Sequence, residues 1–189
     1  MFYKSEWYSD YVRTSDDNKF IFSHFLKNYI FQHRLRYIVY FRIAQATKNK
    51  FIKIFCEYKL YRLCRKYGIE IKTKTKIGKG FVMTHAYNIT VSPFAVLGDN
   101  VKILKGATIG LSAGKKAGAP TIGNRVYIGI NSTVLGGINI GDDVLIAPNT
   151  LVNVDVPSHS VVIGSPCKII PRENATKDYI PDDSYFKNF

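Results

Sequence analysis

The chain has 189 residues, of which 46% are hydrophobic, and it carries a formal net charge of +13. Its three cysteines are odd in number and lack the spacing of metal ligands, which argues against a disulfide scaffold and a zinc site. No apolar run approaches the ~18–20 residues that span a bilayer, and the start MFYKSEWYSD lacks a signal-peptide pattern. We therefore expect a cytoplasmic protein with one main domain and no metal ion.

Most of the positive charge lies near the N-terminus. Residues 1–76 contain 17 Lys and Arg against 6 Asp and Glu, whereas residues 77–189 contain 10 against 8. The stretches 20–46 and 51–67 interleave aromatic and aliphatic residues with basic ones, and we predict that both are helical. They either cover an end of the following domain or contact an anionic membrane surface through residues 20–67. No nucleic-acid-binding motif accompanies the charge, so we expect no nucleic-acid partner.

An aliphatic residue returns every six positions through the middle of the chain. This period matches neither a helix, near 3.6, nor an ordinary strand, at 2, but it is typical of a parallel β-helix built from hexapeptide repeats. One step of two residues interrupts the series near position 90. The series comprises Ile71, Ile77, Met83, Ile89, Val91, Leu97, Ile103, Ile109, Ile122, Ile128, Val134, Ile140, Ile146 and Val152.

The rhythm lapses after Gly110 through LSAGKKAGAP and resumes at Ile122. Insertions in repeat proteins form loops on one face, which is often the binding face. The insertion is therefore either a functional loop or a harmless one. We predict three parts: a basic, aromatic-rich helical segment (1–68), a β-helix domain (69–172) and a C-terminal tail (173–189) whose role the sequence does not indicate.

One of the four histidines stands apart from the others. His24 and His33 lie in the helical segment, where we expect them to pack or to face solvent, and His159 lies in a turn near the end of the repeats. His85 lies in MTHAYNITV, within a hexapeptide. A lone histidine in a repeat is more often structural, but a neutral imidazole can also remove a proton from a hydroxyl.

Three motifs carry a resemblance to a known family. They are His85 in an HA-x-x-I-x-V context, the turn Thr108–Gly110 before the interruption, and the closing segment Val162–Pro166. With them, residues 67–172 resemble serine acetyltransferases. The same region is similar to the bacterial hexapeptide O-acetyltransferases that modify capsule, exopolysaccharide and O-antigen sugars. The resemblance implies an all-β core that forms a left-handed parallel β-helix after an N-terminal α-helical segment. It also implies a homotrimer with active sites shared between subunits, and acetyl-CoA as co-substrate.

The resemblance also implies roles for particular residues. His85 matches the histidine that removes the acceptor's proton, and Glu70 stands where the serine-specific family has an aspartate that orients it. Glu70 is otherwise an ordinary polar residue. Lys168 and Arg172 fall where the family has basic residues near the CoA phosphates, or they are solvated charges. The implied acetyl-CoA-binding residues are Gly110, Lys115, Gly129, Ala147, Lys168 and Arg172.

One departure from the serine-specific pattern concerns the acceptor. That family has a second histidine just before a proline at the end of the loop, where this chain has Ala119 before Pro120. We therefore expect the acceptor to be a hydroxyl of a cell-envelope sugar or polysaccharide. The alternatives are a serine O-acetyltransferase of cysteine biosynthesis and a non-catalytic β-helix scaffold.

Overall fold

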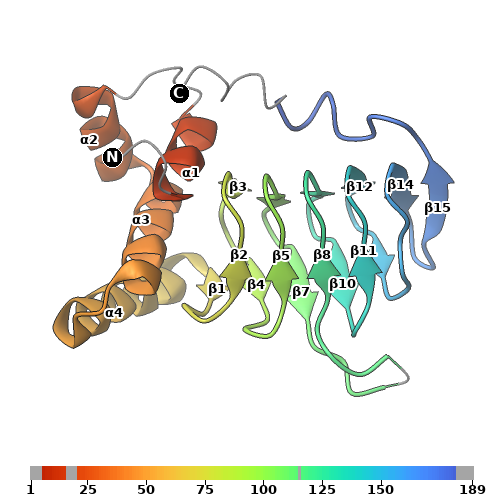
Figure 1. The fold of residues 1–189 in the computed structure, drawn as a ribbon, viewed down its shortest axis with the longest axis horizontal. Helices are drawn as coiled ribbons and strands as arrows, with labels where there is room; N and C mark the ends of the chain where they lie inside the picture. The colour runs from red at the N-terminus through yellow and green to blue at the C-terminus, as the bar shows by residue number, and fades with distance from the viewer. Residues whose placement is uncertain (1–5, 16–20, 115, 182–189) are drawn as a thin grey trace.

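A computed structural model describes residues 6–15, 21–114 and 116–181 of the chain. Four helices lie together at one end of a long solenoid of short parallel strands (Figure 1). The helices are α1 (Glu6–Ser15), α2 (Phe22–Phe31), α3 (His33–Ala46) and α4 (Lys50–Tyr67). The predicted parallel β-helix with an N-terminal helical segment is thus confirmed, whereas the division into three separate parts stays a prediction.

The helical segment differs from its prediction in two places. Helix α1 lies outside the predicted helical stretches, and the stretch 20–46 contains two helices, because Gln32 adopts an extended conformation (φ −105°, ψ 105°) between them. The predicted break near residue 48 is present, since Asn49 caps α4 by accepting hydrogen bonds from two backbone N–H groups. Gly68, with φ 69°, ends α4 in the left-handed conformation that glycine adopts without strain.

Three parallel sheets form the walls of the solenoid. Their orders are β1-β4-β7-β10-β13, β2-β5-β8-β11 and β3-β6-β9-β12-β14, and β15 adds to the third in antiparallel direction. The strands are β1 (Glu70–Ile71), β2 (Lys76–Ile77), β3 (Val82–Thr84), β4 (Thr90–Val91), β5 (Val96–Leu97), β6 (Lys102–Leu104), β7 (Thr108–Gly110), β8 (Thr121–Ile122), β9 (Tyr127–Ile128), β10 (Thr133–Leu135), β11 (Asn139–Ile140), β12 (Val144–Ile146), β13 (Leu151–Val152), β14 (Ser160–Ile163) and β15 (Lys168–Pro171).

The aliphatic series of the sequence forms the core of this solenoid. Its members align from coil to coil in strand register, as in the row Met83, Ile103, Ile128 and Ile146, which Val162 continues on β14. All five of these side chains are fully buried. A hexad supplies one strand and one corner, so one aliphatic side chain per wall points inward, and this accounts for the period of six.

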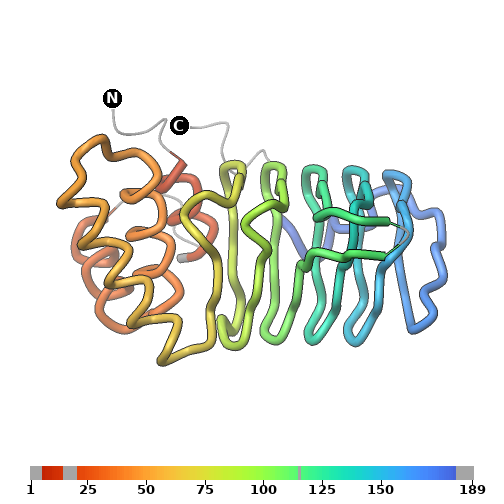
Figure 2. The backbone as a smooth tube through the Cα atoms, turned by 90° about the horizontal axis from the view of Figure 1, so that it is seen from below, coloured from red at the N-terminus to blue at the C-terminus, as the bar shows by residue number. Residues whose placement is uncertain are grey.

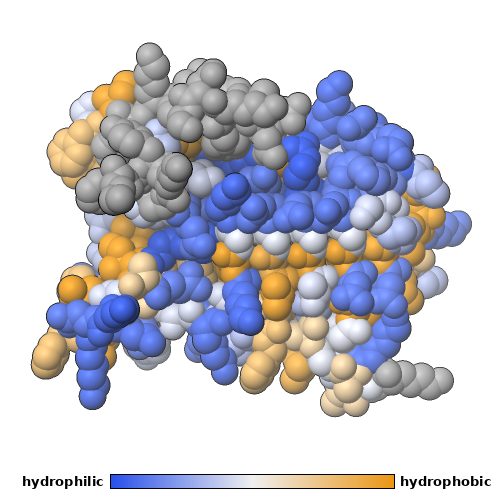
Figure 3. Space-filling model, viewed as in Figure 1, coloured by the Kyte–Doolittle hydropathy of each residue, from blue (hydrophilic) through white to orange (hydrophobic). Residues whose placement is uncertain are grey.

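Polar side chains close one edge of the solenoid by a ladder of hydrogen bonds from coil to coil. At each coil a backbone N–H group donates to the side chain of the equivalent residue in the next coil. The bonds run from Lys79 to Asp99 (3.0 Å), Asp99 to Asn124 (2.8 Å), Asn124 to Asp142 (2.6 Å) and Asp142 to Ser158 (2.9 Å). Figure 3 shows hydrophilic surface above a continuous hydrophobic band across this side of the molecule. The ladder satisfies corner amides that the parallel strands leave unpaired.

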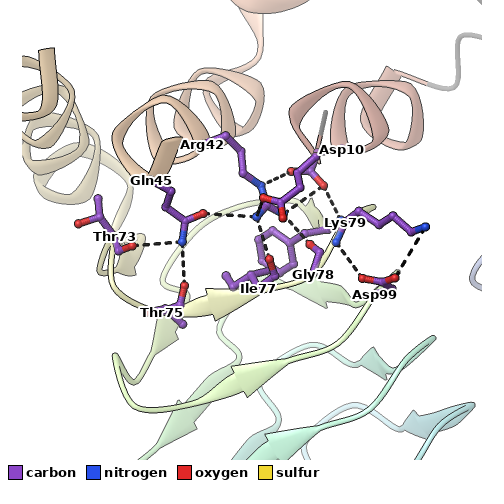
Figure 4. A network of polar contacts seen from close by, with 11 residues as sticks. Asp10, Arg42, Gln45, Thr73, Thr75, Ile77, Gly78, Lys79 and Asp99 are labelled. Atoms are coloured by element: carbon purple, nitrogen blue, oxygen red, sulfur yellow. Dashed lines mark hydrogen bonds and ion pairs between the residues drawn. The ribbon is translucent and has the colours of Figure 1, made fainter. Parts of the chain in front are cut away.

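A buried ion pair anchors α1 and α3 to the first coil (Figure 4). Arg42 donates from Nε to Asp10 at 2.8 Å and from its Nη atoms to the carbonyl oxygens of Ile77 (2.8 Å) and Gly78 (2.5 Å). Asp10 also accepts from the N–H of Phe81 at 2.8 Å. Burial raises the pKa of Asp10 to about 6, against the opposing charge of Arg42. We call these five residues the Arg42 clasp.

The insertion 111–120 folds back over the later coils (Figure 2). Ser112 and Gly118 exchange backbone hydrogen bonds of 3.0 and 2.9 Å, so the insertion is a small hairpin. Lys116 holds its tip by an ion pair of 2.5 Å with Asp155, and its carbonyl accepts from the N–H of Gly137. The insertion therefore covers part of this chain's own solenoid.

After β15 the chain returns along the solenoid toward α1 (Figure 1). Ala175 and Ile180 pack against Leu104, Tyr127 and Leu145 on the outer face of the third sheet. The carboxylate of Asp143 accepts from the backbone N–H groups of Ala175 and Thr176, both at 3.0 Å. The described part of the tail is thus packed along the solenoid. Within the described ranges, no helix is long and apolar enough to cross a membrane.

Candidate active site

His85 lies on a corner of the solenoid that is longer than its neighbours. Along this edge the inward aliphatic residues are six positions apart in the later coils, but Met83 and Val91 are eight apart. The two extra residues make the chain bulge outward. Both His85 (φ 50°) and Asn88 (φ 53°) adopt left-handed conformations there, and His85 is exposed. The step of two residues in the aliphatic series is therefore the sequence signal of this bulge.

The helices hold this corner from outside. The N–H of Asn88 donates to the carbonyl of Tyr67 at 3.0 Å. His33, at the start of α3, bonds through Nε2 to the carbonyl oxygen of Ala86 at 2.8 Å. Its ring stacks on that of Tyr67, with centroids 4.0 Å apart and planes at 14°. Burial is the main cause that lowers the pKa of His33, so the imidazole is neutral at physiological pH.

A pocket of about 310 Å³ opens beside His85. Its lining comes from the junction of α2 and α3 and from the corner itself: Phe31, Gln32, His33, Arg34, His85, Ala86 and Tyr87. Ligand pockets in proteins are typically ~300–1,000 Å³, so this one suits a small molecule. The pocket therefore places an exposed imidazole within a space where a small hydroxyl compound can bind.

Glu70 does not bond to His85 in this structure. Its strand pairs with β4, opposite Thr90, but its half-exposed carboxylate lies 3.4 Å from the ammonium group of Lys72. No hydrogen bond or ion pair joins Glu70 to His85 in the part of the chain that the structure describes. Glu70 instead lines a second cavity of about 540 Å³ beneath α4.

Gly129, Ala147 and Lys168 lie on the same edge of the solenoid as His85. Strand register places Thr84 beside Leu104 and Lys168 opposite Ile163. Gly129 and Ala147 directly follow Ile128 and Ile146, which pair with each other on β9 and β12. The row crosses the sheet from β3 to β15, which is five strand spacings of ~4.8 Å, or about 24 Å. An elongated molecule can therefore extend from the His85 corner toward Lys168.

Along this row the backbone amides are already in use. The N–H groups of Gly129 and Ala147 donate to the carbonyls of Ile146 and Val162, both at 2.9 Å. A Cβ atom at Gly129 would lie 2.6 Å from the backbone nitrogen of Pro148, so the coil stacking itself requires glycine. Because neither Gly129 nor Ala147 has a large side chain, this part of the row presents a shallow surface to a ligand.

The other predicted acetyl-CoA residues lie elsewhere on this chain. Gly110 ends β7 on a different edge, where the hairpin 111–120 begins. Arg172 lies at the far end of β15 from Lys168, with its N–H bonded to the carbonyl of His159 at 2.7 Å. Lys115 falls outside the described residues. No group of three or more His, Cys, Asp or Glu side chains within those residues could hold a metal ion.

The contacts of His33 and Tyr67 at this corner were not predicted from the sequence. Their contacts join residues far apart in the chain, 53 positions in the case of His33 and Ala86. Neither residue belongs to the hexapeptide pattern, and a local pattern carries no signal for such a contact. The only indication was the position of His33 within a segment expected to pack against the solenoid.

Comparison with known proteins gives consistent matches. Residues 119–153 match the family model described as bacterial transferase hexapeptide (six repeats). A serine acetyltransferase of Helicobacter pylori is 39% identical over 137 residues, which cover 70% of this chain and 78% of that protein. Serine acetyltransferase 2 of Arabidopsis thaliana is 37% identical over 132 residues, covering 69% of this chain and 41% of that protein. The chain thus spans about two fifths of the plant relative.

Solved structures agree with these relatives. The serine acetyltransferase of Neisseria gonorrhoeae superposes with a TM-score of 0.73 at 29% identity, covering 89% of this chain and 66% of that one. A serine acetyltransferase in complex with CoA superposes with a TM-score of 0.70 at 26% identity, covering 87% of this chain and 68% of that one. The similarity extends over the helices as well as the solenoid.

These matches overturn the expected acceptor. We expected a cell-envelope sugar or polysaccharide because Ala119 replaces a histidine of the serine-specific pattern, but the relatives are serine acetyltransferases. One missing histidine in a loop does not outweigh 39% identity over 70% of the chain. The expectation of a glycan acceptor is therefore wrong, and the serine-specific alternative is the better supported one.

Proposed function

Because the chain belongs to the serine acetyltransferase family of hexapeptide-repeat acetyltransferases, we propose that it transfers an acetyl group from acetyl-CoA to the hydroxyl of L-serine. The observation that carries this proposal is the 39% identity to a serine acetyltransferase of which the chain covers 78%. A small acceptor also suits the pocket of about 310 Å³ beside His85.

His85 acts in this proposal as the general base. Its imidazole takes the proton of the serine hydroxyl while the oxygen attacks the thioester carbonyl of acetyl-CoA. The CoA sulfur then leaves as a thiolate and recovers a proton, so no covalent acyl-enzyme forms. General-base assistance is typically worth ~10²–10⁴-fold in rate. The exposed position of His85 on an outward corner supports this role, and Glu70 would orient it only after releasing Lys72.

The edge from the His85 corner to Lys168 is the proposed seat of acetyl-CoA. In this proposal the thioester of acetyl-CoA lies at the corner. The pantetheine arm follows the shallow surface at Gly129 and Ala147, and the phosphates approach Lys168. Gly110, Lys115 and Arg172, which lie off this edge or outside the described residues, contribute in this proposal from a neighbouring subunit. Lys168→Glu should therefore raise KM for acetyl-CoA more than KM for serine.

We further propose that the protein is a cytoplasmic homotrimer. The outer face of the first sheet carries short side chains in register, among them Thr90, Thr108 and Thr133, so another subunit can approach closely. Light scattering after gel filtration measures the mass directly. A monomeric mass at the concentration of the activity assay would contradict the trimer.

The exposed face of α4 is the proposed contact with anionic membrane lipids. Phe51 is 83% exposed, and Phe55 and Tyr58 are exposed by about half. Lys59 lies 5.2 Å from the ring of Phe55, and Arg62 lies 6.0 Å from the ring of Tyr58. If this face bound a second copy of the chain, like charges would be brought together. Binding to an anionic membrane surface is instead stabilised by ~1 kcal/mol for each nearby Lys or Arg.

Vesicle sedimentation tests this membrane contact. Binding to vesicles that contain phosphatidylglycerol, weakened by salt and lost in a Phe51→Ser and Arg62→Glu double variant, is the expected result. Lys76→Glu, on β2, is the matched control. Equal sedimentation with pure phosphatidylcholine, or a change in oligomeric mass in the variant without any vesicle binding, would contradict lipid contact.

Release of free CoA thiol from acetyl-CoA tests the main proposal, with L-serine in one reaction and sugars in others. We expect turnover with serine, and a loss of ~10²–10⁴-fold in kcat for His85→Ala. Since Ala119 cannot make the contact that the family's histidine provides, Ala119→His should lower KM for serine. Turnover with a sugar but not with serine would refute the proposed acceptor.

A further inference from the structure

We propose that His33 is a positioning residue that holds the corner carrying His85, through its hydrogen bond to the carbonyl of Ala86. This inference rests on the proposed function, because it assigns His33 a part in the same site. His33 lines the pocket beside His85, and the group it binds belongs to the residue that follows His85.

The hydrogen bond fixes the state of the His33 ring. A carbonyl oxygen only accepts, so Nε2 must carry the hydrogen in the 2.8 Å contact with Ala86. Tyr67 stacks on one face of the ring at 4.0 Å, and Tyr87 is tilted against it at 4.8 Å. The ring is therefore oriented by packing as well as by its hydrogen bond.

Helix α3 forms a rigid support for this contact. One turn beyond His33, the hydroxyl of Tyr37 donates to the carbonyl of Ile71 at 2.9 Å and accepts from its N–H at 3.0 Å. Farther along, Arg42 bonds to the carbonyls of Ile77 and Gly78. Gln45, in the last turn, donates to the carbonyls of Thr73 and Thr75 at 3.1 and 2.9 Å. The helix is thus bonded to the first coil at four places, and His33 is the one that reaches the corner.

The corner requires such support more than the other corners of this edge. It contains two additional residues, and two of its non-glycine residues, His85 and Asn88, have positive φ. Residues with backbone dihedral angles in sparsely populated φ/ψ regions keep that conformation only where the surrounding structure holds them. Without the His33 bond, the carbonyl of Ala86 is released and the backbone that carries His85 is less restrained.

Misplacement of a catalytic group by about 1 Å can cost ~10²-fold in rate. We therefore expect His33→Phe, which keeps an aromatic ring but has no donor, to lower kcat by about 10- to 100-fold. KM for acetyl-CoA should change little, because only the thioester lies at the corner and the rest of the proposed seat extends away from His33 toward Lys168. His33→Gln retains an N–H donor and should recover most of the lost kcat.

The experiment measures kcat and both KM values for these two variants, with His24→Phe as a matched control on the exposed helix α2. Unchanged kcat in His33→Phe, or an equal loss in His33→Gln, would overturn the inference. If His33→Phe does not fold, the ¹⁵N spectrum of the wild-type ring decides: a hydrogen on Nδ1 and none on Nε2 overturns it.

A second readout separates this inference from the proposed function. The N–H of Tyr87 bonds within the corner to the carbonyl of His85 at 2.7 Å, and its hydrogen exchange needs no substrate. It should exchange at least about 10-fold faster in His33→Phe than in wild type or His33→Gln, whatever the acceptor. Absence of turnover with serine would then refute the proposed function alone, whereas unchanged exchange would refute the role of His33.

Discussion

Replacing Arg42 with methionine removes the central cation of the Arg42 clasp while keeping a long apolar side chain. Arg42 is 5% exposed and Asp10 is fully buried, so the substitution leaves a carboxylate in the interior without its partner. The carbonyl oxygens of Ile77 and Gly78 lose donors at the same time. Removing one partner of a buried ion pair costs about 3–5 kcal/mol. We expect a loss of that size in the free energy of unfolding.

The loss should depend on pH in a direction that the structure fixes. Burial raises the pKa of Asp10 to about 6, and Arg42 is the main group that lowers it. Without Arg42 the folded pKa rises further above that of the unfolded chain. A raised folded pKa contributes stability that is present at low pH and lost as pH rises through it. The difference between variant and wild type should therefore be larger at about pH 8 than at about pH 5.

Urea unfolding at a fixed protein concentration measures both effects. The single tryptophan, Trp7, lies on α1 one turn from Asp10, so its fluorescence reports release of this helix. Arg62→Met, on the exposed face of α4, is the control and should change stability by less than about 0.5 kcal/mol. A loss below about 1 kcal/mol in Arg42→Met, equal at both pH values, would refute the reasoning.

Three further substitutions test the solenoid. Burial opposes the ionisation of Asp143, but hydrogen bonds from Thr176, His159 and Ala175 outweigh it and lower the pKa of this carboxyl group. The contact between Asp143 and the tail should therefore weaken only as pH falls through that lowered pKa. Asp143→Ala should speed limited proteolysis of the tail at neutral pH, and equal rates would contradict the contact. Asn124→Ala removes the acceptor for the N–H of Asp99, an exposed hydrogen bond, and should cost about 0.5–1.5 kcal/mol in urea unfolding; a neutral effect would argue against the ladder. Gly129→Ala should cost about 1–3 kcal/mol through overpacking against the next coil, and an unchanged melting temperature would contradict that clash.

The period of the sequence determined the solenoid. Each hexad places one aliphatic side chain in a narrow interior, so the pattern needs no knowledge of distant contacts, and Ile103 or Ile128 could be assigned to the core directly. The extra step between Met83 and Val91 also marked the corner that carries His85. Resemblance to a family then supplied the role of that histidine, which spacing alone did not.

Tertiary structure decided how the helices meet the solenoid. The contact of His33 with Ala86 joins residues 53 positions apart, and the bonds of Asp10 in the Arg42 clasp join residues 32 and 71 positions apart, for which a local pattern has no signal. The same holds for the tail, whose polar sequence conceals its packing on Tyr127. Local periodicity specifies an element that repeats, because each repeat meets the same neighbours. Contacts at the end of the solenoid occur once, and only the folded chain brings their partners together.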